Sequence, residues 1–261
     1  MICVFDCESI PDVELLRKIY DYGGNDIEVC EMAFKAQENL NGSSFLPLPF
    51  HKIISISAVI CDDNCNFIKV GNYKEGLSEQ EIISDFLFYF NKHNPKLVSF
   101  NGRAFDIPLI MLRAMKYNLN ANAYFEVENT KYNKNKWDNY RSRYSENFHI
   151  DLLDCLSFFG AARAMRLDAV CKMANIPGKF DTSGDDVFRL YYEGEIQKIN
   201  DYCQSDVLNT YWLFLKYLLL QDKISIEDYA SLLNTFFDKI PRDKNYTDIF
   251  RDSIMQELDR L

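Results

Sequence analysis

Short apolar runs bounded by turn signals predict the strands of this chain. Residues 2–5 form an apolar run that ends in Asp6-Cys7-Glu8, as expected for a short buried strand with two carboxylates at its end. Residues 51–61 are β-rich and largely apolar, and after a turn at 62–64 residues 66–70 predict the returning strand of a hairpin. Two more apolar stretches, at 96–100 and 148–150, predict further short strands.

Helical periodicity covers most of the remaining residues. Ser78 and Glu81 form a capping-box pattern that opens one helix, and Pro108 is tolerated in the first turn of another. Residues 118–147 are rich in Asn, Tyr and Lys and predict a loop. The predicted helices are 13–22, 27–40, 82–93, one from about 105, one from 151, 167–176, 194–221 and two in the tail from 225, separated at Pro241.

The order of these elements predicts an α/β fold, in which a mixed sheet of antiparallel hairpin strands and parallel strands is flanked by helices. A chain of 261 residues with 48% hydrophobic residues can build such a core, which excludes wholesale disorder. We expect one domain over residues 1–261, with an insertion near 11–50 and a helical C-terminal tail at 222–261.

The composition argues against secretion, a membrane span and a zinc site. The first residues, MICVFD, lack the basic and apolar regions of a signal peptide, and no apolar run reaches the ~18–20 residues that cross a bilayer. Eight cysteines without a CxxC pair and three scattered histidines favour reduced thiols over bound zinc. We therefore expect a cytoplasmic protein with no membrane partner.

The formal net charge of −10 at first argues against a nucleic-acid partner. Bound cations would cancel part of this charge, however, and phosphate contact needs only a local basic patch. Basic and aromatic residues alternate within 131–143, so this segment is either a phosphate-binding patch or a solvated loop. Its basic residues are Lys131, Lys134, Lys136, Arg141 and Arg143.

The first candidate for chemistry is the pair Asp6 and Glu8. Residues i and i+2 of a strand point to the same face, so these carboxylates project together while Cys7 faces the other side. Two like charges this close at the edge of a core repel each other and lose hydration. A divalent metal is the usual compensation.

Two further acidic elements follow along the chain. Asp106 comes just after a strand and the Asn101-Gly102 turn, and Tyr202 and Asp206 share one face of the long predicted helix by their i, i+4 spacing. Taken singly, Asp106 also fits a helix cap and Asp206 a surface position. We interpret Asp151 and Asp154 as an N-cap and a first-turn acid rather than ligands.

Together these elements form the series D-x-E, N-x3-F-D and Y-x3-D. The series resembles the DEDD superfamily of 3′–5′ exonucleases, within the RNase H-like fold, and Tyr202 points to its tyrosine subclass, DEDDy. The finer resemblance is to stand-alone bacterial proteins similar to the exonuclease domain of family-B DNA polymerases. It covers roughly residues 1–220 and includes the pieces His149-Ile-Asp-Leu, Leu167-Asp-Ala-Val, Pro177-Gly-Lys179 and Gly184-Asp-Asp-Val.

This resemblance implies a two-metal mechanism with two Mg²⁺ or Mn²⁺ ions. By analogy with the family, Asp6 bridges both ions, and Glu8 and Asp206 hold the ion that activates water. Asp106 supports the second ion, through water. Tyr202 orients the attacking water, because a phenol with a pKa near 10 is a poor base unless it is perturbed.

The resemblance also implies four substrate-binding positions. The backbone at Ser9 and Ile10 would face the 3′ end, and Ile10 would wedge between bases. Asn101 and Phe105 match positions that approach the terminal nucleotides. Phe105 is interpreted either as a stacking surface for a base or as a core aromatic at a helix start.

These features predict a metal-dependent 3′–5′ exonuclease that acts on the 3′ ends of single-stranded DNA in repair or processing. We expect no polymerase module, because few residues follow Asp206. Two alternatives remain open: a 3′–5′ exoribonuclease, which the same site would serve, and a catalytically silent nucleic-acid-binding module. The sequence does not assign a role to the 11–50 insertion.

Overall fold

The computed structural model describes residues 1–162, 165–179 and 187–261, and its centre is a five-stranded sheet of order β3-β2-β1-β4-β5. The hairpin strands β2 and β3 run antiparallel to their neighbours, whereas β1, β4 and β5 are parallel. This mixed sheet confirms the predicted α/β fold. The strands are β1 Ile2–Pro11, β2 His51–Cys61, β3 Phe67–Asn72, β4 Lys96–Ser99 and β5 His149–Asp151.

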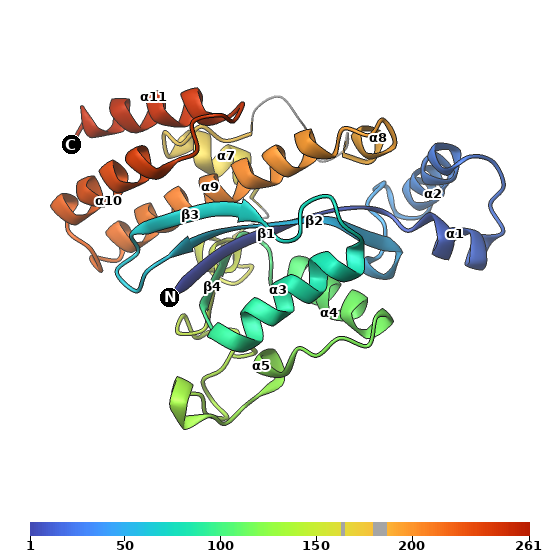
Figure 1. Cartoon of the computed structure of the whole chain (residues 1–261), viewed down its shortest axis with the longest axis horizontal. Coiled ribbons are helices and arrows are strands. Elements are labelled where there is room, and N and C mark those ends of the chain that lie inside the picture. The colour runs from blue at the N-terminus through green and yellow to red at the C-terminus, as the bar shows by residue number, and fades with distance from the viewer. Residues whose placement is uncertain (163–164, 180–186) are drawn as a thin grey trace.

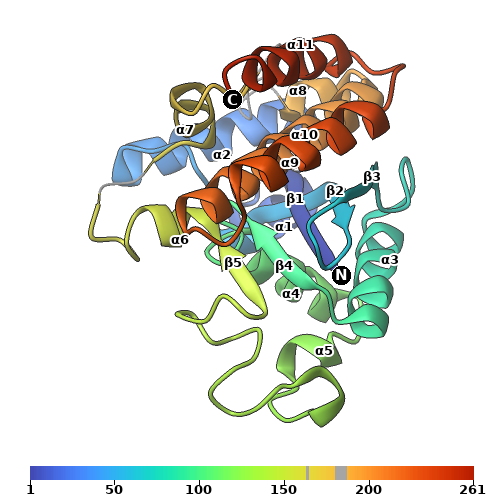
Figure 2. The same cartoon turned by 90° about the vertical axis from the view of Figure 1, so that its left-hand side faces the viewer.

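Helices cover both faces of the sheet (Figures 1 and 2): α9, α10 and α11 lie on one face, and α3 and α4 lie on the other. None of the helices in the described ranges is long and apolar enough to cross a bilayer. The helices are α1 Val13–Tyr20, α2 Asp26–Asn41, α3 Glu79–His93, α4 Asp106–Lys116, α5 Asn122–Phe125, α6 Leu152–Leu156, α7 Leu167–Met173, α8 Val187–Tyr192, α9 Ile196–Leu220, α10 Ile226–Lys239 and α11 Thr247–Leu258.

The central strand β1 directs its side chains alternately to the two helical layers. Val4 lies in the apolar cluster on the α9 side, and Phe5 lies in the cluster on the α3–α4 side. Asp6 and Glu8 continue the series of Val4 and so face α9. We expected this strand to end near Glu8. Instead it runs to Pro11, because β2 keeps pairing with it beyond a bulge at Glu8/Ser9.

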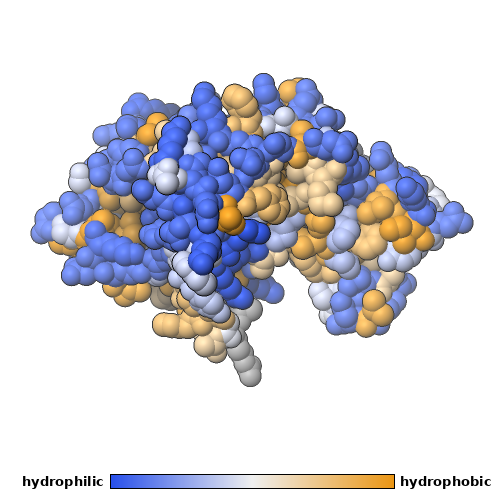
Figure 3. All heavy atoms as spheres, turned by 90° about the horizontal axis from the view of Figure 1, so that it is seen from below, coloured by the Kyte–Doolittle hydropathy of each residue, from blue (hydrophilic) through white to orange (hydrophobic). Residues whose placement is uncertain are grey.

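The segment between β1 and β2 forms α1 and α2 at one end of the molecule (Figure 1). Seen from below in Figure 3, the molecule is hollowed between this end and its main body, and apolar side chains line part of the hollow. Gly42, with φ +78°, ends α2, and the chain then returns to β2 through residues 43–50. Leu46 is buried in a small cluster with Leu16 and Val29, which ties this return segment to both helices.

The C-terminal helices α10 and α11 pack in the same apolar cluster as the sheet and α9. Trp212 of α9 donates a hydrogen bond to the Tyr229 hydroxyl of α10 at 2.8 Å. Phe236 and Phe250 are completely buried in this cluster. The tail therefore packs against both α9 and strand β3, where Lys239 donates to the carbonyl of Phe67 at 3.0 Å.

The segment 118–147 departs most from its prediction as an open loop. It contains α5 and a 3₁₀ turn at Thr130–Tyr132. Lys134 is only 4% exposed, and its ammonium donates to Asn94 (2.5 Å) and to the carbonyl of Ala123 (2.7 Å). Lys134 therefore fits neither of the two interpretations of this segment, a phosphate-binding patch or a solvated loop, because its buried charge holds the loop together.

Candidate active site

The structure brings together the residues of the three acidic motifs. Asp6 and Glu8 come from β1, Asp106 from the first turn of α4, and Tyr202 and Asp206 from the middle of α9. All five line one cleft of about 640 Å³. The cleft lies at the carboxyl-terminal end of the parallel strands, where ligand sites of α/β sheets gather.

The Asn101-Gly102 turn places Asp106 in this cleft. Asn101 adopts φ +71°, and a Cβ atom at Gly102 would lie only 2.6 Å from the side chain of Ser99. Asp151 accepts hydrogen bonds from the backbone N–H groups of Asn101 (2.9 Å) and Arg103 (2.8 Å). The same side chain caps α6, as predicted, so it is an anchor for the turn as well as an N-cap.

Cys7 links the central strand to Asp106. Its N–H and its Sγ–H both donate to Oδ1 of Asp106, at 3.1 and 2.9 Å. Burial raises the pKa of Asp106 to about 6, although the bonds from Cys7 oppose this shift. The second carboxylate oxygen of Asp106, Oδ2, lies close to the turn, 3.3 Å from where a Cβ atom at Gly102 would be.

A buried chain of polar side chains holds α9 against the sheet. Oδ1 of Asn200 accepts hydrogen bonds from Ser55 of β2 (2.7 Å) and Asn72 of β3 (3.2 Å). One turn later, Gln204 donates to Asn72 and accepts from the hydroxyl of Tyr246 (2.6 Å) in the segment before α11. These contacts fix the rotation of α9 about its axis, and with it the helix face that carries the site.

Burial and mutual repulsion raise the pKa values of the cleft carboxyls. Burial has the largest effect on Asp6, and the charges of Asp106 and Glu8 add to it, so its pKa lies well above the usual value. Burial and the Asp206 charge raise the pKa of Glu8 to about 8, despite the opposing Lys179 ammonium. Burial likewise raises the pKa of Asp206 against the effect of Lys179. Additional positive charge would favour the ionised forms.

Lys179 is a site residue to which the sequence argument gave no role. Its ammonium donates a hydrogen bond to the Tyr202 hydroxyl and lies 3.4 Å from Oδ2 of Asp206. Burial alone would lower the pKa of Lys179, but the charges of Asp206 and Glu8 outweigh it and raise the pKa. Lys179 therefore remains a cation and offsets part of the carboxylate charge.

The segment before Lys179 is held from two sides. Asn209 of α9 accepts from the N–H of Gly178 (3.0 Å) and donates to its carbonyl (2.9 Å). Asp168 of α7 accepts from the N–H of Lys179 (2.8 Å). Gly178 has φ +74°, and a Cβ there would lie 2.6 Å from Asp168. These contacts give a physical reason for the Leu167-Asp and Pro177-Gly-Lys pieces, whereas residues 184–186 of the Gly184-Asp-Asp-Val piece lie outside the described residues.

The donor atoms of the cleft fit a divalent cation. Oδ1 of Asp206 is buried without a hydrogen-bond partner among residues 1–162, 165–179 and 187–261. Ligand atoms of Asp6, Glu8 and Cys203 lie within 4.8 Å of one another. Burial raises the pKa of the Cys203 thiol well above its usual value, so Cys203 is a neutral donor. The carboxylate oxygens are therefore the better ligands for a hard ion.

The predicted substrate-binding positions differ in their access to the cleft. Asn101 and Phe105 line it, and Ser9 lines an adjoining pocket. Ile10 is only 2% exposed and packs in a cluster with Phe188. The expected wedge at Ile10 is therefore not available in this structure, because the side chain follows Glu8 onto the α9 face of the strand and is buried there against α8 and α9.

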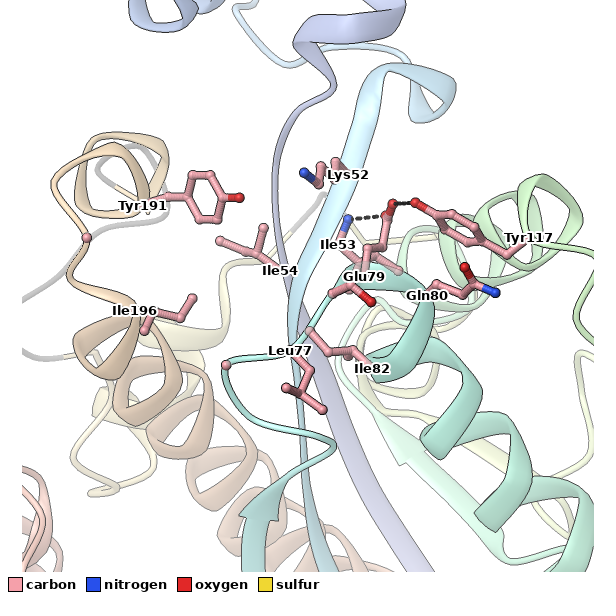
Figure 4. Close-up of a pocket in the computed structure, with 13 residues that line it drawn as sticks. Lys52, Ile53, Ile54, Leu77, Glu79, Gln80, Ile82, Tyr117, Tyr191 and Ile196 are labelled. Carbon is pink, nitrogen blue, oxygen red and sulfur yellow. Dashed lines mark hydrogen bonds between the residues drawn. The ribbon is translucent and has the colours of Figure 1, made fainter.

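A second cavity, of about 430 Å³, lies beside α3 and β2 (Figure 4). Glu79 is the most buried charged side chain along its wall. Its carboxylate already accepts hydrogen bonds from the N–H of Ile53 (2.7 Å), the hydroxyl of Tyr117 (2.5 Å) and Arg113. This cavity therefore lacks the unsatisfied charge that distinguishes the carboxylate cleft.

Known proteins of similar sequence or fold include DNA polymerases. The chain is 25% identical to a DNA polymerase of Archaeoglobus fulgidus over 186 residues, which are 70% of this chain and 22% of that protein. Its fold is similar to that of the family B DNA polymerase of the hyperthermophilic archaeon Pyrobaculum calidifontis, with a TM-score of 0.50 and 14% identity over 90% of this chain and 28% of that chain. The chain spans roughly a quarter of the length of these relatives. A family model described as predicted 3′–5′ exonucleases related to the exonuclease domain of PolB matches residues 43–254, and the chain belongs to this family.

Proposed function

We propose that this protein is a metal-dependent 3′–5′ exonuclease that removes nucleotides from single-stranded DNA ends. The observation that carries this proposal is the meeting of Asp6, Glu8, Asp106 and Asp206 in one cleft, with pKa values raised by burial. The chain itself supplies too little positive charge to balance these carboxylates, so the site is suited to binding cations. Family membership supports hydrolysis of a phosphodiester as the reaction.

The four carboxylates would hold two divalent cations, Mg²⁺ or Mn²⁺. When bound, such ions activate water and stabilise the charge that develops on phosphate and on the leaving 3′ oxygen. The charges of Asp106 and Glu8 both raise the pKa of Asp6, so its carboxylate interacts with both groups. This suits Asp6 to be the ligand that the two ions would share. Asp106 is fixed through Oδ1 by Cys7, so it contributes its other oxygen.

Tyr202 would orient the attacking water rather than take its proton. Burial and the charge of Glu8 raise the pKa of its phenol, which therefore stays protonated at neutral pH. The ammonium of Lys179 donates to the phenol oxygen, so the phenol acts as a donor through its own proton, for which Asp206 or a water is the acceptor. Lys179 thus positions Tyr202 and also reduces the repulsion between the carboxylates and an incoming phosphate.

Oligonucleotides with a 5′ or a 3′ label test this proposal. With Mn²⁺ or Mg²⁺, a 5′-labelled single strand should shorten stepwise, and a 3′-labelled strand should release its label in the first step. Excess EDTA should stop both reactions. A 5′-labelled strand that stays intact would overturn the proposal, and an intact but tightly bound strand would favour a silent binding module. Matched DNA and RNA strands decide between deoxyribonuclease and exoribonuclease activity.

A further inference from the structure

We propose that the segment between β1 and β2 builds a pocket for the base of the 3′-terminal nucleotide, with Phe45 as its stacking surface. This inference rests on the proposed nuclease function and adds a specificity-determining residue to it. It also gives the inserted segment of residues 11–50 a role in binding the substrate.

The pocket adjoins the carboxylate cleft directly. It has a volume of about 460 Å³, within the usual range for small-ligand sites. Cys7, Glu8, Phe45 and Phe105 line both the pocket and the cleft, so the two spaces adjoin at these side chains. A nucleotide whose phosphate lies at the carboxylates would therefore have its base within reach of the pocket.

The residues around Phe45 hold its ring at the wall of this pocket. It is 58% exposed, while the next residue, Leu46, is buried and accepts a hydrogen bond through its carbonyl from Nε2 of His51 (3.0 Å). The ring of Phe45 lies 5.0 Å from the ring of His51 and 5.4 Å from that of Phe105. Ser9 donates to Nδ1 of the same histidine (3.0 Å), which joins β1 to this aromatic group. The exposed ring is therefore held in place rather than free to collapse.

The lining of the pocket selects a base over a phosphate. Its walls are mainly aromatic and apolar, with Phe34 and Phe188 in the lining beside Phe45, and the lining residues in the described part of the chain include neither lysine nor arginine. Glu8 at its mouth would repel a phosphate. The hydroxyls of Ser43 and Ser44 offer few contacts for reading a base edge, so we expect little preference among bases.

Equilibrium binding of single-stranded DNA with an ordinary or an abasic 3′-terminal nucleotide tests this pocket. Binding is measured by fluorescence anisotropy with Ca²⁺ in place of Mg²⁺, so that hydrolysis is slowed. Phe45→Ala should weaken binding of the ordinary strand by about 5- to 150-fold, the range given by loss of one base–aromatic stack. It should change binding of the abasic strand by less than about two-fold, and Phe45→Trp should restore the ordinary strand.

Phe88→Ala is the matched control, because Phe88 is 66% exposed on α3 and does not line this pocket. An equal loss for both strands in Phe45→Ala, or no loss for either, would overturn the inference. The nuclease proposal is judged separately, on the wild-type protein with Mg²⁺. If Phe45 distinguishes the two strands but the wild-type protein hydrolyses neither, the pocket inference stands and the nuclease proposal fails.

Discussion

Two clusters of buried charge are joined by helix α4, and they differ in how their charge is balanced. At one end of the helix, Arg113 donates to Asp12 (2.6 Å) and to both oxygens of Glu79 (2.7 and 2.5 Å). At the other end, Asp106 meets three more carboxylates, with Lys179 paired to one of them and Arg166 also in the lining of the cleft. The first cluster is nearly balanced within the chain, whereas the second has a clear excess of negative charge.

The pKa shifts have opposite signs in the two clusters. Burial alone would raise the pKa of Asp12, but hydrogen bonds from Arg113 and the N–H of Leu15 outweigh it and lower the pKa. Burial raises the pKa of Asp6, and its neighbours add to the shift instead of opposing it. Burial by itself therefore does not mark a functional site. The mark of a functional site is a buried cluster whose charges the fold leaves unbalanced.

The largest effect is expected from Asp6→Asn in the unbalanced cluster. Exonuclease activity should fall by about a thousand-fold or more, because a ligand for the catalytic ions is lost. In EDTA at pH 7, however, the free energy of unfolding should rise by about 1 kcal/mol or more, because the raised pKa of Asp6 means that folding must either retain an unfavourable charge or take up a proton, and asparagine requires neither. Activity on 5′-labelled strands and urea unfolding in EDTA measure the two effects.

The two measurements on Asp6→Asn test different parts of the contrast between the two clusters. Full activity would remove Asp6 from the site. A large loss of stability in EDTA would mean that its carboxylate is compensated within the chain after all, as in the cluster around Arg113.

Arg113→Met should mainly reduce stability. It leaves Asp12 and Glu79 buried without their shared cation, and the free energy of unfolding should fall by about 3–5 kcal/mol. Urea unfolding measures this loss. Arg17→Met is the control, because its bond to Asp26 (2.7 Å) lies at the surface and is worth about 1 kcal/mol or less. Similar losses in the two variants would show that the buried cluster is no more important than a surface pair.

Local signals in the sequence predicted much of this fold. The capping box of Ser78 and Glu81 and the cap at Asp151 are found where expected, because a cap depends on a few neighbouring residues. The alternation along β1 gave the shared face of Asp6 and Glu8. The motifs at Asp106 and Asp206 gave the partners that line the same cleft.

The remaining features depend on contacts between distant segments. Lys179 reaches the cleft only because Asn209, far along the chain on α9, holds Gly178. Ile10 shares the face of the β1 carboxylates, as the alternation of β1 predicts, but its burial depends on α8 and α9, which come from far along the chain and pack over it. Lys134 looked like a free cation in a polar loop, but the fold encloses it. Such positions follow from tertiary packing rather than from residue type and spacing.

The smallest effect is expected from Asp12→Asn, which makes in the balanced cluster the same change as Asp6→Asn. Asparagine caps α1 as well as aspartate does, so the variant isolates the lost charge beside Arg113. At pH 7 we expect a loss of about 1–3 kcal/mol, measured by urea unfolding. Because the folded-state pKa of Asp12 is lowered, its contribution is present above the ordinary value of 3.8 and fades as the pH falls below about 5. The difference from wild type should therefore be constant above about pH 5 and shrink as the pH falls from there through 3.8 and below. If both asparagine variants shift stability in the same direction in EDTA, the two clusters do not differ in charge balance, and the excess of carboxylate loses its value as a sign of the catalytic site.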